Sequence, residues 1–150
     1  MEPRDPHFES RVRESFERQA FMATLGASLA RVAPGAIDIR LPVAPGLLQQ
    51  HGSVHAGALA SVLDSASGYA AFSLMPAEAG VVSVEFKLNL LEPARGEWIE
   101  ARGRVIRPGR TLFACTAEAW AFGAPHGPDG KRVAIFQGTM MCLTGRGVVG

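Results

Sequence analysis

The chain lacks several features that point to common classes of protein. Its 150 residues carry 15 Lys and Arg against 14 Asp and Glu, so the formal net charge is only +1. A protein with almost no net field has no general attraction for nucleic acid or acidic lipid. We therefore expect neither nucleic acid nor a membrane as a partner, and any anion site must be a local group of arginines.

Cysteine is also scarce, with only Cys115 and Cys142. Both lie in apolar, strand-like runs, which predicts two buried free thiols rather than a disulfide. The first ten residues are rich in charge and contain no apolar block, so we expect no secretory signal at the start of the chain. The longest stretch of low charge, residues 52–75, contains Asp64 and many small residues, which favours a buried helix over a membrane span. These features predict a cytoplasmic protein.

Common catalytic signatures are missing as well. The sequence has no Gly-x-Ser-x-Gly elbow of a serine hydrolase and neither a phosphate-binding loop nor a dinucleotide fingerprint. His51 and His55 could form a metal pair, but no third ligand stands nearby in the sequence, and zinc sites need three or four. We therefore expect no metal.

What is present is a globular composition, with 47% hydrophobic residues and a length that suits one domain. We expect a single domain over residues 1–150, with residues 1–24 as an N-terminal helical extension. Asp5 and Pro6 are good helix-starting residues, and apolar residues at helical spacing predict an amphipathic helix over about 7–21. Residues 26–41 predict a β-hairpin that turns at Pro34 and Gly35.

The rest of the chain predicts one long helix followed by strands. Residues 55–75 are apolar nearly all round, which is typical of a buried helix. Strict alternation over residues 82–90 predicts a strand with Val82, Val84, Phe86, Leu88 and Leu90 on one buried face. Further strands are expected at residues 97–107, 112–122 and 133–143, with a loop at 123–130. Because short turns join these strands, we expect an α+β fold in which an antiparallel sheet of about six strands curls around the helix.

Asp64 lies on the apolar helix, where burial of a carboxylate is costly unless the group is paired or functional. Burial also tends to raise the pKa of a carboxyl group, which suits a base or nucleophile. Ser65 and Gly68 fall on the same helical stripe and could shape a niche around it. A structural Asp held by backbone or Ser hydrogen bonds explains the helix pattern equally well.

The start of this helix offers a second candidate. Unpaired backbone N–H groups at His55, Ala56 and Gly57 could form an oxyanion hole for a thioester carbonyl. His55 and Asp64 are nine positions apart, or roughly 13 Å along the helix axis. One substrate can hardly reach both in a single chain. If both act on one substrate, two antiparallel copies of the helix must meet, and the enzyme is a dimer.

Arginines gather on and beyond the strand at 97–107, and they could bind CoA phosphates. A solvated strand face and turn is the simpler interpretation of any single one. The candidates are Arg102, Arg104, Arg107 and Arg110.

The segment QQHGSVHAGALASVLDSASGYAA, residues 49–71, resembles the hotdog-fold acyl-CoA thioesterases of the phenylacetate-degradation type. These carry a His-Gly-Gly motif with an acidic residue nine positions after the His, which His55, Ala56, Gly57 and Asp64 match. The later runs VVSVEFKLNLLEPARG and GRVIRPGRT also look like strands of that family. The resemblance implies a hotdog fold that assembles into dimers and often tetramers.

The resemblance also implies roles for individual residues. It makes Asp64 the nucleophile or general base, and gives carbonyl polarisation to an N–H of Ala56 or Gly57 from the other subunit. An amide at Gln49 or Gln50 and the hydroxyl of Ser83 would line the site. We count His55 among the catalytic residues, and Ser65, Gly68, His51, Arg107, Arg110 and Thr111 among the substrate-binding ones.

The function implied is hydrolysis of a medium-chain or aromatic acyl-CoA, with no cofactor because CoA is part of the substrate. Two other readings stay open. A hotdog dehydratase or hydratase would use His51 as base with Asp64 as its acidic partner. A non-catalytic acyl-thioester binding module would leave the cost of burying Asp64 unexplained.

Overall fold

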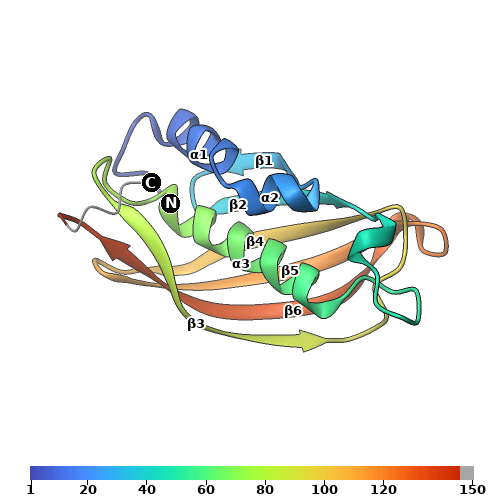
Figure 1. Cartoon of the computed structure of the whole chain (residues 1–150). Coiled ribbons are helices and arrows are strands. Elements are labelled where there is room, and N and C mark those ends of the chain that lie inside the picture. The colour runs from blue at the N-terminus through green and yellow to red at the C-terminus, as the bar shows by residue number, and fades with distance from the viewer. Residues whose placement is uncertain (146–150) are drawn as a thin grey trace.

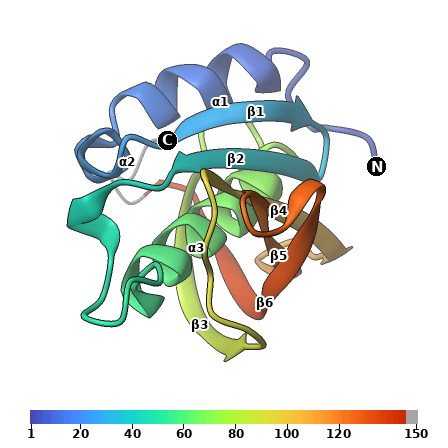
Figure 2. The same ribbon diagram turned by 90° about the vertical axis from the view of Figure 1, so that its right-hand side faces the viewer.

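The computed structural model describes residues 1–145. Its elements, in chain order, are α1 (Phe8–Glu17), α2 (Ala20–Leu25), β1 (Ser28–Ala33), β2 (Ala36–Pro42), the short 3-10 helix η1 (Pro45–Leu47), α3 (Ala56–Phe72), β3 (Gly80–Leu90), β4 (Trp98–Pro108), β5 (Leu112–Gly123) and β6 (Gly127–Leu143). The strands form one antiparallel sheet in the order β1-β2-β4-β5-β6-β3. Figure 1 shows α3 lying along the sheet, and Figure 2 shows the sheet curling around it. This is the α+β arrangement that the sequence predicts.

Helix α3 is the centre of the core, as expected from its apolar composition. Most of its side chains are buried against the sheet. Gly103 of β4 allows the closest approach, because a Cβ there would lie 2.3 Å from the backbone carbon and oxygen of Ala66. The helix ends at Phe72, three residues before the predicted limit, and residues 73–75 form a turn before Pro76. Within residues 1–145 no helix is long and apolar enough to cross a membrane.

The single N-terminal helix predicted over 7–21 is wrong in its extent, because the structure has two helices. The chain leaves the helical conformation at Gln19 (φ −81°, ψ 89°), and α2 then continues to Gly26, whose left-handed φ of 72° ends it. Arg11 fixes α1 to the end of α3. Its guanidinium donates hydrogen bonds to four backbone carbonyls, those of Phe72, Met75, Pro76 and Ala77, and it forms an ion pair with the buried Asp5.

Strand β3 differs from the prediction in a way that matters for function. Its apolar residues were expected to be buried, yet the side chains of Val82, Val84, Phe86 and Leu90 are exposed because β3 is an edge strand. The strict alternation also breaks at a bulge between Ser83 and Glu85. Ser83 before the bulge and Phe86 after it therefore both face the α3 side, where they contact Asp64 and Phe136 respectively.

The other strands agree closely with the prediction, except at one turn. The hairpin of β1 and β2 turns at Pro34 and Gly35, as expected. Strand β6 begins at Gly127, so most of the loop predicted at 123–130 is strand instead, and only a tight turn remains between β5 and β6. Both cysteines are free thiols; Cys115 is buried, as predicted, but Cys142 is only partly buried.

Candidate active site

Asp64 stands in the middle of α3, half-buried, and receives a hydrogen bond from Ser83 of β3. The Ser83 hydroxyl donates to Asp64 Oδ1 over 2.7 Å and also lies 3.4 Å from Met140 Sδ. Burial raises the pKa of the Asp64 carboxyl above its usual range, and the Ser83 hydrogen bond opposes this by lowering it. Among residues 1–145 no cation forms an ion pair with Asp64. Asp64 therefore has the environment of a base whose basicity is enhanced by desolvation.

A cavity of about 340 Å³ opens beside this carboxylate. The predicted residues Asp64, Ser65, Gly68 and Ser83 all line it, so the structure brings this part of the predicted site together. Sequence reasoning missed Ser15 of α1 and Arg18 and Gln19 just after it, which reach the same cavity. Tyr69, one of the α3 residues that could line an acyl tunnel, also lines it. In the single helix predicted over 7–21, Ser15 and Gln19 are four positions apart and would share a face. That spacing was a possible signal, but nothing in the sequence connects it to Asp64.

The start of α3 is organised by His55, its N-cap residue. His55 Nδ1 accepts a hydrogen bond from the Gly57 N–H over 2.8 Å. The imidazole must therefore carry its proton on Nε2 when neutral. Since the Gly57 N–H is occupied, the Ala56 N–H is the free donor of the pair: within residues 1–145 no acceptor is recorded for it.

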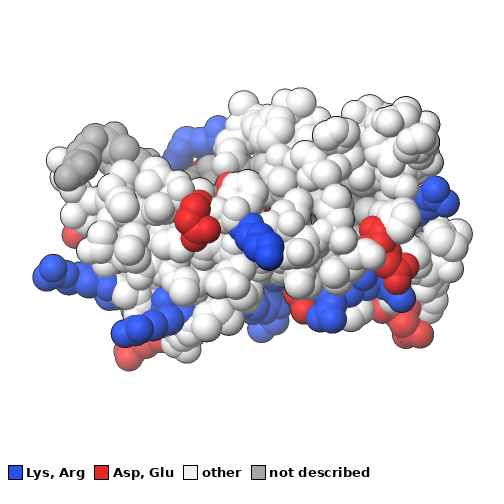
Figure 3. Space-filling view, turned by 90° about the horizontal axis from the view of Figure 1, so that it is seen from below, with Lys and Arg blue, Asp and Glu red and all other residues white. Residues whose placement is uncertain are grey.

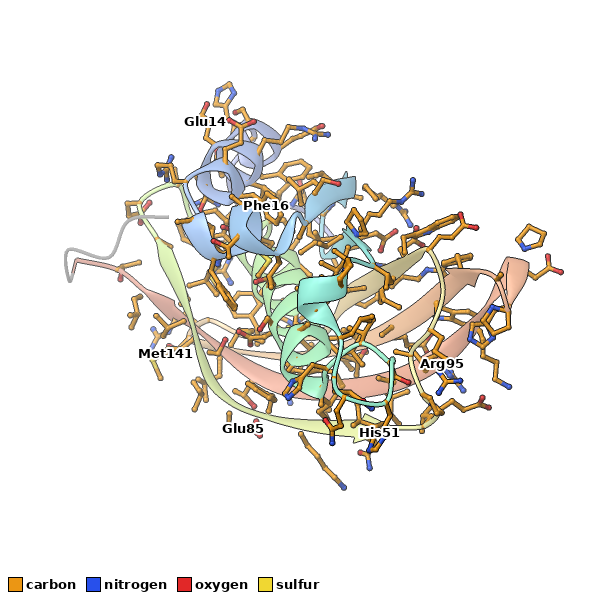
Figure 4. All side chains as sticks on the ribbon, turned by 45° about the vertical axis from the view of Figure 1, so that its right-hand side comes forward. Glu14, Phe16, His51, Glu85, Arg95 and Met141 are labelled. Carbon is orange, nitrogen blue, oxygen red and sulfur yellow. The ribbon has the colours of Figure 1, made fainter. Side chains whose placement is uncertain are left out.

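The turn before α3 is held rigidly by its own side chains and by the β3–β4 connection. The Gln49 side-chain oxygen accepts a hydrogen bond from the His51 N–H. Arg95 donates to Ser53 Oγ over 3.2 Å and to the His51 carbonyl over 3.4 Å, and Figure 4 shows His51 and Arg95 on the same side of the molecule, near the start of α3. Gln50 is exposed, with its amide nitrogen 3.4 Å from His51 Nε2.

This turn and the start of α3 line a second cavity of about 660 Å³. It contains the predicted Gln49, Gln50, His51, His55 and Ala56, and also Arg95, which sequence reasoning missed. Asp64 and Ser83 line the first cavity and not this one. The candidate residues thus fall into two groups in a single chain, one around the carboxylate and one around the helix start.

Arg107, Arg110 and Thr111 line neither cavity. They are exposed at the β4–β5 turn, where the Thr111 carbonyl accepts a hydrogen bond from the Cys142 N–H of β6. Of the neighbouring arginines, Arg104 is paired with Asp38 and Arg102 with Glu100 over 2.7 Å. Their CoA-binding role stays a prediction. Within the described part of the chain, no three His, Cys, Asp or Glu side chains are grouped so as to hold a metal ion.

Comparisons with known proteins identify the family and the fold of the chain. Residues 51–124 match the model of the Thioesterase superfamily. A solved structure of a thioesterase family protein from Silicibacter pomeroyi is 48% identical, covers 92% of this chain and 99% of its own, and superposes with a TM-score of 0.88. A protein of Deinococcus radiodurans, provisionally named an esterase, is 30% identical over 83% of this chain and 80% of its own length.

The E. coli PaaI protein from the phenylacetic acid degradation operon has the same fold. Its solved structure is 22% identical, covers 92% of this chain and 94% of its own, and gives a TM-score of 0.80. At this level of identity the likeness concerns the fold alone. Together with the curled sheet around α3, these comparisons confirm the predicted hotdog fold.

Proposed function

We propose that this chain, which belongs to the thioesterase superfamily, hydrolyses acyl-CoA thioesters and uses Asp64 to attack the carbonyl or to activate water. The observation that carries the proposal is the state of Asp64. It is a half-buried carboxylate beside a cavity, with its pKa raised by burial. Within residues 1–145 no cation pairs its charge, and the Ser83 hydroxyl is bonded to Oδ1 alone, so Oδ2 has no recorded partner and is available to a substrate or a water.

In the general-base route, Asp64 takes a proton from water as the water oxygen bonds to the thioester carbonyl carbon. Negative charge then develops on the carbonyl oxygen, where the Ala56 N–H at a helix start would stabilise it. The C–S bond breaks and CoA leaves as a thiolate, so no strong general acid is needed. In the nucleophilic route, a carboxylate oxygen of Asp64 bonds to the carbonyl carbon, the C–S bond breaks and CoA leaves as a thiolate; water then hydrolyses the resulting mixed anhydride to the free acid and regenerates Asp64.

The two groups of residues are expected to meet across a dimer. Ala56 begins α3 and Asp64 follows eight positions later, so about 12 Å of helix separates them. A partner chain with α3 antiparallel would place its Ala56 opposite this Asp64. Support comes from β3, an edge strand whose side chains Val82, Val84 and Phe86 are 37%, 50% and 45% exposed. An edge strand with exposed apolar side chains is a template for pairing with another chain, and Figure 3 shows this underside as white surface with charged groups of both signs scattered over it.

A thiol-release assay over a panel of acyl-CoAs, run with the native protein and with Asp64→Asn, tests the chemistry. The native protein should release CoA thiol, and Asp64→Asn should lose most of this activity while it remains folded. Thiol release that does not depend on Asp64 would overturn the mechanism. Loss of enoyl absorbance without thiol release would favour the dehydratase or hydratase. Binding without turnover of any thioester would favour the binding module.

A mixing experiment tests whether the site spans two chains. Ala56→Pro removes the proposed carbonyl donor, and Pro is well tolerated at the first position of a helix. His55 before it is already extended (φ −61°, ψ 138°), as a residue before Pro requires. If equal amounts of Ala56→Pro and Asp64→Asn chains are unfolded and refolded together, each mixed dimer should contain one intact site of two. Random pairing makes about half of the dimers mixed, so the mixture should recover about a quarter of native activity. No recovery in demonstrated mixed dimers would place the complete site within one chain.

A further inference from the structure

The N-terminal helices reach the cavity beside Asp64 and form its far wall. Ser15 of α1 shares a hydrogen bond of 3.3 Å with the Tyr69 hydroxyl, and Gln19 accepts one of 3.4 Å from Ser65. Phe16 packs on the Tyr69 ring, with the ring centroids 5.6 Å apart, and Figure 4 shows Phe16 on the side away from His51. The segment is therefore a fixed part of this cavity.

This wall is rich in hydrogen-bond donors. Because the Gln19 side-chain oxygen is the acceptor for Ser65, its amide nitrogen has two N–H groups left to donate. Arg18, whose side chain is exposed, adds a guanidinium to this lining, and among residues 1–145 no hydrogen-bond or ion-pair partner is recorded for it. Burial raises the pKa of Tyr69, and the Ser15 hydrogen bond and the charge of Arg18 oppose this by lowering it. Arg18 and Tyr69 line the same cavity.

Gly68 gives this end of the cavity its room. It lines the cavity in the middle of α3, and a Cβ built there would meet no atom within 4 Å. Glycine inside a helix costs up to about 1 kcal/mol relative to alanine, and no close packing in the chain requires it at this position. The cavity is open to solvent and measures about 340 Å³, so at about 30 Å³ for each water-sized group it has room for a short acyl group.

We infer that the cavity between Asp64 and the N-terminal helices binds a short acyl group whose far end is a carboxylate, held by Arg18 and Gln19. The substrate class is the CoA monothioester of a short dicarboxylic acid. This rests on the proposed function, because it places the thioester carbonyl at Asp64. A carboxylate would accept hydrogen bonds from the Gln19 amide and pair the charge of Arg18, which an alkyl or unsubstituted aromatic acyl end cannot do.

The test compares adipyl-CoA with hexanoyl-CoA, which differ in the terminal carboxylate. We expect kcat/KM of the native protein for adipyl-CoA to exceed that for hexanoyl-CoA by roughly 10- to 100-fold, the range of a hydrogen bond to a charged group. Arg18→Met should remove this preference, mainly by raising KM for adipyl-CoA. Arg13→Met is the matched control, because Arg13 is an exposed arginine of α1 that does not line the cavity, and it should keep the preference.

Equal rates for the two thioesters would overturn the inference, and so would a preference for adipyl-CoA that survives Arg18→Met. Neither result would contradict the proposed function as long as hydrolysis still requires Asp64. A preference for hydroxyphenylacetyl-CoA over both would also overturn it, in favour of an uncharged polar end. If no thioester is hydrolysed, the proposed function fails. Calorimetry then tests the inference by itself: adipyl-CoA should bind more tightly than hexanoyl-CoA, and equal affinities would overturn it. Gly68→Leu adds a check on position: it should weaken adipyl-CoA binding without lowering the melting temperature, and unchanged binding would contradict the placement.

Discussion

The hydrogen bond from Ser83 to Asp64 makes a quantitative prediction about the pH dependence of catalysis. Ser83→Ala removes the hydroxyl that donates to Asp64 Oδ1 over 2.7 Å, and with it the effect that lowers the pKa of this carboxyl. Burial, which raises that pKa, is unaffected. The acid limb of the pH profile should therefore move to higher pH, because the carboxylate form of Asp64 is the active one in both routes.

The size of the shift follows from the strength of the bond. A hydrogen bond to a charged group contributes about 1.5–3 kcal/mol, and one pKa unit corresponds to about 1.4 kcal/mol. In Ser83→Ala we expect the acid limb of the kcat/KM profile to shift to higher pH by roughly 1–2 units. Near neutral pH the variant can still be active, since deprotonated Asp64 would then be a stronger base.

The assay is thiol release measured from acid to neutral pH, with Ser83→Thr as the matched control because it retains a hydroxyl and suits a strand. The profile of Ser83→Thr should stay close to that of the native protein. A uniform loss of rate in Ser83→Ala with no movement of the acid limb would refute the reasoning. It would mean that Ser83 acts on substrate or water and does not set the pKa of Asp64.

Three further predictions concern stability and the helix start. Burial raises the pKa of Asp64 in the folded protein above its ordinary value of 3.8, so the stability of the native protein falls as pH rises through the folded pKa. Asp64→Asn should therefore be more stable than the native protein at neutral pH. Thermal unfolding should show this difference vanish below about pH 4, where Asp64 is protonated in both the folded and the unfolded chain. Arg11→Met should lower the free energy of unfolding measured in urea by about 3–5 kcal/mol, because it leaves the buried Asp5 and the carbonyls at the end of α3 unpaired. The control Arg13→Met breaks an exposed ion pair and should lower it by less than about 0.5 kcal/mol. Ala56→Pro should lower kcat by about 10²–10³-fold if its N–H stabilises the oxyanion, with an unchanged melting temperature, and an unaffected kcat would exclude that role.

The central part of the fold follows from local patterns in the sequence. Residues 56–72 are apolar around the whole helix, so they had to be buried, and the short turns between the later strands required antiparallel pairing. Asp64 could be found for the same reason, since a carboxylate inside an apolar helix needs an explanation. These signals are local, and no information about distant residues is required to read them.

The features that sequence reasoning missed depend on contacts between distant residues. The alternation at 82–90 indicates a strand with an apolar side, but it does not say whether the same chain or another covers that side. The apolar and polar alternation of the sequence does not predict the bulge near Val84, beside which Ser83 contacts Asp64. The sequence pattern does not predict the break between the helices at Gln19 either. In the structure the Gln19 side chain contacts Ser65 of α3.

The position of Asp64 along α3 suits the role of a base for a physical reason. The positive end of a helix stabilises negative charge mainly within the first turn. A carboxylate near Ala56 would gain this stabilisation and become a weaker base. Asp64 lies more than two turns later, beyond that influence, where burial raises its pKa instead. The same helix can thus offer a positive end to a developing oxyanion and a basic carboxylate to water. Both are possible because Ala56 and Asp64 are far apart along α3, and that separation is the reason that we expect two chains to share each site.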